Sequence, residues 1–123
     1  MANPNLINAS SIYGSTSYLI PSTTSATTWT ALTPAAGTVN KIDNIVAANV
    51  TASTATLTVS INSAAAGAGT AYRLIYQVPV PANAAIVIAD KSTAFYLGEA
   101  QSVVVTSGTA SAIELTASYE AIT

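Results

Sequence analysis

Alternation of residue type at every second position dominates the middle of this chain. From Thr54 to Ile61, hydroxyl-bearing and apolar residues alternate without a break. Side chains of a β-strand point alternately to its two faces, whereas one face of a helix repeats every three to four residues. The run therefore predicts a strand with Leu57, Val59 and Ile61 on a core face and the threonines on the opposite face.

Four other segments have the composition of strands. Residues 40–50 and 112–122 carry apolar side chains at near-alternate positions, with Ile113, Leu115, Ala117 and Tyr119 in the second of them. Residues 72–78 predict a strand covered on both faces, and residues 85–89 form a continuous apolar run of the buried kind.

Turn-forming residues separate these segments at regular spacing. Pro, Gly and Asn clusters recur roughly every 10 to 15 residues, and the Gly-containing stretch at 64–71 predicts a hairpin loop. This rhythm is typical of a single antiparallel β-sandwich or jelly-roll-like domain of about eight strands. We assign it to residues 17–123. Residues 1–16 are either an extended N-terminal arm that lies across a neighbouring subunit or the first edge strand of the sheet.

Composition excludes several classes of function. The 123 residues include no Cys and no His, which removes disulfides, zinc–thiolate sites and Ser–His catalysis. Only three basic residues oppose five acidic ones, so no surface for nucleic-acid phosphates is expected. No apolar run approaches the roughly 20 residues of a membrane-spanning helix. We expect no metal, no cofactor, no nucleic acid and no membrane among its partners.

The five acidic residues do not predict a catalytic pair. Asp43 and Asp90 each lie close to a lysine in the sequence, and Glu99 falls in a Gly-containing turn, so all three are interpreted as surface charges. Glu114 and Glu120 share one predicted strand but lie roughly 20 Å apart at about 3.3 Å per residue. We predict that the protein is not an enzyme and has no catalytic residues.

Apolar and aromatic side chains are the candidates for partner binding. Tyrosine is frequent where a ring is buried against a partner and a hydroxyl is hydrogen-bonded, and pairs of rings can also stack on a glycan. Tyr72 and Tyr76, four apart on a predicted strand, are expected on one face. The candidate partner-binding residues are Leu6, Ile7, Ile12, Tyr13, Tyr72, Tyr76 and Tyr96.

Several stretches, in order along most of the chain, resemble a small virion structural protein of tailed bacteriophages, especially those of marine cyanobacteria. They are the opening NLINASSIYG and TSYLIPST, the central KIDNIVAANVTASTATLTVSI and the final VPVPANAAIVIADKSTAFYLGEAQSVVVTSGTASAIELTASYEAI. The motifs that carry the resemblance are Ala48-Asn49-Val50, Val80-Pro81-Ala82-Asn83 and Ser118-Tyr119-Glu120.

The resemblance implies a β-sandwich carried on the virion. We expect a capsid decoration or cement protein that binds the major capsid protein and stabilises the head, made in the host cytoplasm and placed on the capsid surface. Self-association as a dimer or trimer is expected. The alternative is a tail, baseplate or fibre component, including an adhesin that binds glycans through its tyrosines. Deletion of residues 2–12 is expected to leave a folded domain that no longer binds its assembly.

Overall fold

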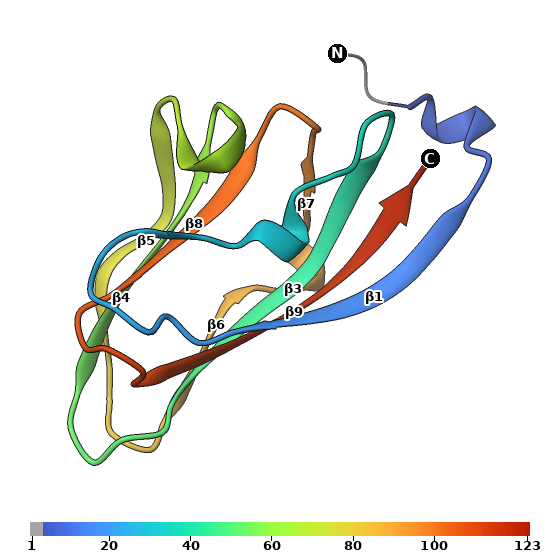
Figure 1. Cartoon of the computed structure of the whole chain (residues 1–123). Coiled ribbons are helices and arrows are strands. Elements are labelled where there is room, and N and C mark those ends of the chain that lie inside the picture. The colour runs from blue at the N-terminus through green and yellow to red at the C-terminus, as the bar shows by residue number, and fades with distance from the viewer. Residues whose placement is uncertain (1–3) are drawn as a thin grey trace.

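The computed structural model describes residues 4–123, so the first three residues of the predicted arm lie outside the described residues. The regular structure consists of strands and short 3-10 turns, which loops connect (Figure 1). The strands are β1 (Ile12–Leu19), β2 (Thr27–Thr28), β3 (Val39–Asn49), β4 (Ala55–Asn62), β5 (Ala71–Val80), β6 (Ala85–Ala89), β7 (Phe95–Leu97), β8 (Ser102–Ser107) and β9 (Ile113–Ile122).

Two antiparallel sheets pack face to face. Sheet A has the order β1-β9-β3-β6, with β7 also paired to β3, and sheet B has the order β2-β8-β4-β5. The prediction of an all-β sandwich is confirmed, with nine strands in the described part of the chain. β1 is the edge strand of sheet A, and its unbroken register with β9 runs through the predicted boundary between residues 16 and 17.

The core lies between the sheets and follows the alternation predicted for β4 and β9. Leu57 and Val59 are fully buried, as are Ile113 and Ala117 on β9. Ile61 packs against the core, on the face predicted for it, but it is only partly buried and not fully buried like Leu57 and Val59. The reason is its place near one end of the sandwich, opposite the exposed Tyr72 of the edge strand β5.

The loop from 63 to 70 covers part of the outer face of sheet B. The backbone N–H of Gly67 donates to Ser102 Oγ, and Ser102 Oγ donates to the carbonyl of Ala64. Gly67 has φ +77°, and a Cβ there would lie 2.6 Å from Thr28 Oγ1, so both backbone conformation and space require glycine. The predicted hairpin loop thus covers Ser102 and Asn62, whose buried side chains both hydrogen-bond to Gly67.

Strands β5 and β6 correct two predictions of burial. β5 is an edge strand, and most of its side chains from Tyr72 to Pro79 are exposed rather than covered on both faces. β6 is the other end of sheet A, with Ile86 and Ile88 turned toward the core and Val87 61% exposed. An apolar run on an edge strand lacks a neighbour on one side, which composition alone does not reveal.

Polar groups inside the sandwich are paired. Within residues 4–123, every buried side-chain nitrogen and oxygen has a hydrogen-bond partner. Asn49 is the clearest case: its Nδ2 donates to the carbonyls of Ser53 and Val80 at 2.8 and 2.9 Å, and its Oδ1 accepts from the N–H and hydroxyl of Thr51. This one side chain ties the end of β3 to the end of β5.

Asn49→Asp is expected to lower the free energy of unfolding by about 2–3 kcal/mol, because a carboxylate would face the Val80 carbonyl without donating to it. Urea denaturation followed by circular dichroism measures the change. Asn5→Asp is the matched control, since Asn5 uses only its Oδ1, which accepts from the N–H of Ile7. Equal stability of the two variants would contradict the role assigned to the Asn49 amide.

Candidate functional site: an apolar end of sheet A

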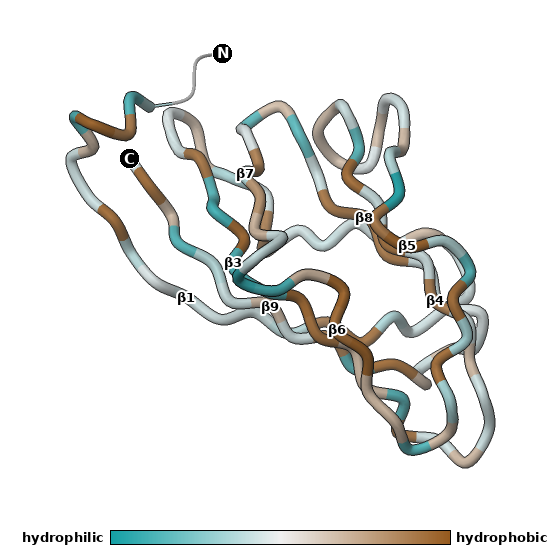
Figure 2. The backbone as a smooth tube through the Cα atoms, turned by 180° about the vertical axis from the view of Figure 1, so that it is seen from behind, coloured by the Kyte–Doolittle hydropathy of each residue, from teal (hydrophilic) through white to brown (hydrophobic). Residues whose placement is uncertain are grey.

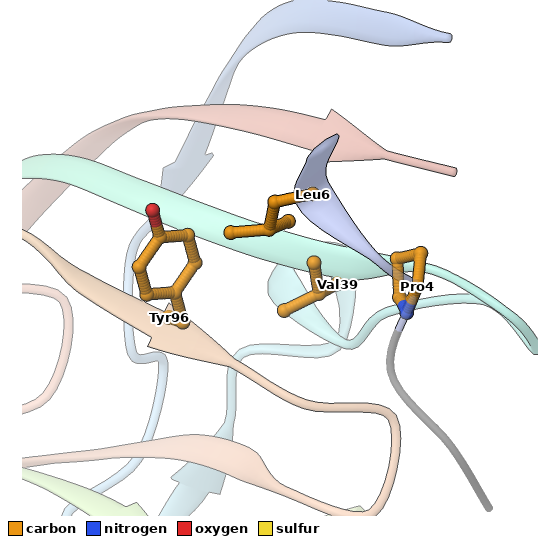
Figure 3. Close-up of a pocket in the computed structure, with 4 residues that line it drawn as sticks. All are labelled: Pro4, Leu6, Val39 and Tyr96. Atoms are coloured by element: carbon orange, nitrogen blue, oxygen red, sulfur yellow. The ribbon is translucent and has the colours of Figure 1, made fainter. Parts of the chain in front are cut away.

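An open apolar hollow lies on the outer face of sheet A, where the N-terminal segment crosses it. Pro4, Leu6, Val39 and Tyr96 line this hollow, which has a volume of about 260 Å³. In Figure 3 the side chains of Leu6 and Val39 lie between the Tyr96 ring and Pro4. The only side-chain polar group among the four is the Tyr96 hydroxyl, so the hollow suits apolar atoms of a partner.

Strand register explains how residues distant in sequence meet there. Val39 on β3 pairs with Ile122 on β9, and Ile122 pairs with Ile12 on β1, which gives an apolar row across three strands. The row faces outward, because Ile42, an odd number of positions from Val39 on β3, belongs to the core between the sheets. Tyr96 joins the same face through its pairing with Lys41.

The N-terminal segment is held over this row by backbone hydrogen bonds. The N–H groups of Ser10 and Ser11 donate to the carbonyl of Thr123, and Asn5 caps the 3-10 turn η1 (Leu6–Asn8) by accepting from Ile7. Figure 2 shows the apolar residues of η1 beside the apolar end of β9. Val39 and Ile122 are consequently 2% and 6% exposed, although they lie outside the main core.

Much apolar surface remains exposed around the hollow. We call the set Pro4, Leu6, Ile7, Ile12, Val39, Tyr96 and Ile122 the apolar end. Ile7 is 92% exposed and Ile12 is 60% exposed. Of the predicted partner-binding residues, the structure brings Leu6 and Tyr96 together in the hollow and places Ile7 and Ile12 beside it. Tyr13 is exposed on the opposite side of β1, where it pairs with Ala121.

Tyr72 and Tyr76 lie elsewhere, on β5 in sheet B, and do not line the hollow. Two register shifts in the β4–β5 pairing place Arg73 opposite Ser60 and Ile75 opposite Val59. Simple alternation therefore fails along β5, and the prediction that Tyr72 and Tyr76 share a face does not hold. Tyr76 instead has the Arg73 guanidinium 4.9 Å from its ring centre, a cation–π contact.

Several charged residues have structural partners. Lys41 and Asp43 form an exposed ion pair at 3.8 Å. Asp90 caps the 3-10 turn η4 (Lys91–Thr93), and the Ser92 hydroxyl that donates to it holds the pKa of this carboxyl below its ordinary value. Glu99, interpreted as a surface charge, is instead only 9% exposed and accepts from the backbone N–H of Gly37.

Sequence reasoning missed three residues of interest. Pro4 and Val39 line the hollow, and Tyr18 on β1 is 75% exposed on the outer face of sheet A. Tyr18 pairs with Thr116 on β9, which places it on the same face as Ile12. The sequence could have indicated Tyr18, because it lies six positions from Ile12 and residues an even number of positions apart on a strand share a face. No local signal in the sequence marks Val39, because its role depends on the approach of residues 4–8.

The site offers shape and apolar contact rather than reactive groups. Among residues 4–123, no three side chains of the types that bind metals gather in one place. The same part of the chain contains no helix that is long and apolar enough to cross a membrane. No protein-family model matches the chain, and no curated protein matches it significantly.

Proposed function

We propose that this protein is a non-enzymatic structural component of a phage virion, a capsid decoration or cement protein that docks on the major capsid protein through the apolar end. The observation that carries the proposal is the exposed apolar surface around the hollow of Leu6 and Tyr96, on the outer face of sheet A. Its occupant would be an apolar protein segment, because the hollow has no charged lining residue.

Composition and the resemblance support the same role. A free domain usually carries about a quarter charged residues, whereas 7% of this chain is charged. A surface of hydroxyls and small apolar groups can be buried in an assembly without leaving unpaired charges. The motifs that resemble phage virion proteins lie within the same framework, at the ends of β3 and β5 and inside β9.

The competing proposal of a glycan-binding tail component requires tyrosines that gather in one groove. Tyr96 lies on sheet A, whereas Tyr72 and Tyr76 lie on sheet B, so the three rings are not parts of one surface hollow. We therefore favour the capsid role. Cryo-electron microscopy of the phage particle tests it: copies of the sandwich distributed over the head lattice are expected, and copies confined to the tail would contradict it.

A double variant, Leu6→Ser with Tyr96→Ser, is expected to weaken binding to purified heads by about tenfold or more. Each truncation removes apolar contact worth roughly 1–2 kcal/mol when buried by a partner, and 1.4 kcal/mol is tenfold in affinity. Co-sedimentation of the variant with heads that lack the protein measures the effect.

The matched control for this binding experiment is Tyr72→Ser with Tyr76→Ser on β5. Both double variants truncate exposed side chains, so both are expected to melt close to the parent protein. The β5 variant should bind heads normally. Loss of binding in the β5 variant alone would move the docking surface to sheet B and contradict the assignment of the apolar end.

A further inference from the structure

The free edges of the two sheets differ in how well they are protected. Exposed edge strands expose unpaired backbone groups, and proteins usually protect them with charges, prolines, bulges or short length. In the described chain β2 has two residues, β7 has three and β6 has five, and β5 contains Arg73, Pro79 and two register shifts. β1 has eight residues in unbroken register and contains no charge and no proline.

The hydrogen bonds of β9 show which backbone groups of β1 face outward. Ser11 and Thr123 exchange two hydrogen bonds, at 3.3 and 2.9 Å, and therefore form a hydrogen-bonded antiparallel pair. Such pairs alternate along a ladder, so Tyr13, Ser15, Ser17 and Leu19 also direct their backbone groups toward β9. The intervening residues, Ile12, Gly14, Thr16 and Tyr18, direct theirs away from the sheet.

We propose that β1 pairs with β1 of a second copy of this chain, antiparallel about a twofold axis at Ser15. This register places Ile12 opposite Tyr18 of the second copy and Gly14 opposite Thr16, and it uses all four outward-facing residues of each strand. About eight backbone hydrogen bonds would join two copies of sheet A into one continuous sheet. The inference does not depend on a role in a virion.

The chemistry of β1 favours its own copy as the occupant. Ile12 and Tyr18 are 60% and 75% exposed on the same face of sheet A, and in this register each covers the other across the axis. Aromatic and β-branched residues opposite one another stabilise paired strands. Because β1 contains no charge, the antiparallel copy brings no like charges together. The small Gly14 leaves room opposite Thr16.

A single cysteine tests the register, because the natural chain has none. Ser15 would face its own counterpart in a non-hydrogen-bonded pair, with Cα atoms about 4.5 Å apart, a distance a disulfide can span. Ser15→Cys is expected to form a covalent dimer under mild oxidation. Tyr13→Cys is the control, since its counterpart would lie about 13 Å away along the strand. Equal crosslinking of the two variants would overturn the proposed axis.

Analytical ultracentrifugation tests the interface itself. The parent protein is expected to sediment as a dimer, and Thr16→Pro as a monomer, because proline removes an outward N–H without removing a bond to β9. Thr16→Val keeps that N–H and is expected to remain dimeric. A parent protein that is monomeric at all concentrations, or a dimeric and folded Thr16→Pro variant, would overturn the proposal. The crosslinking result stands even where the proline variant fails to fold.

Discussion

Val59→Asp is expected to abolish the folded state. Val59 is completely buried between the two sheets, with 0% solvent exposure. Its cross-strand neighbours are Val105 on β8 and Ile75 on β5. A carboxylate there would have no partner, and burying an unpaired charge costs several kcal/mol. A domain of this size is stable by only about 5–15 kcal/mol, so one such charge is enough to unfold it.

The measurement for Val59→Asp is thermal unfolding followed by circular dichroism, in which no cooperative transition is expected. Thr56→Asp on the same strand is the control, since Thr56 is exposed on the outer face of sheet B. Val59→Ala should still fold, with a loss of about 2–3 kcal/mol from the removed methyl groups and the cavity they leave. A soluble Val59→Asp protein that melts cooperatively would contradict the inward orientation of Val59.

The success of the sequence prediction at β4 and β9 has a physical reason. Each of these strands has neighbours on both sides, and one of its faces looks into the core, so its apolar residues fall at alternate positions. Leu57, Val59, Leu115 and Ala117 follow that pattern and are buried. Where one face of a strand is buried along its whole length, the period-two alternation of apolar residues shows directly which residues face the core.

The failures at β5 and β6 have a complementary reason. Local sequence does not state whether an apolar strand lies in the middle or at the edge of a sheet, since that depends on pairing with distant strands. The bulges near Arg73 and Gln77 add to the difficulty, because each changes which side chains face the core. Gln77 has φ +48°, a conformation that its residue type does not predict.

The candidate site was predictable only in part. Exposed apolar residues near the N-terminus, such as Leu6 and Ile12, were recognisable because they lie outside any long alternating run. That these residues lie next to Val39 and Tyr96 could not be predicted, because it depends on the strand order β1-β9-β3 and on the pairing of β7 with β3. Glu99 illustrates the same limit, because its partner Gly37 is 62 residues away.

Trp29 is expected to be the most sensitive aromatic residue of the fold. It is 1% exposed and lies between β2 and the 3-10 turn η2 (Thr30–Leu32). Its backbone N–H donates to the carbonyl of Val103 on sheet B, and its indole Nε1–H donates to Ser17 Oγ on sheet A at 3.0 Å. One residue thus links the two sheets, through its backbone to sheet B and through its indole to sheet A.

Trp29→Ala is expected to cost about 3–5 kcal/mol, through lost burial and the cavity left in the core. Trp29→Phe keeps an aromatic ring but loses the bond to Ser17, so a smaller loss of about 1–3 kcal/mol is expected. Ser17→Ala isolates the hydrogen bond, since it leaves the buried indole N–H without its acceptor. Urea denaturation followed by far-ultraviolet circular dichroism compares all three. If Trp29→Ala were no less stable than Ser17→Ala, the hydrogen bond rather than the ring would hold the sheets together here.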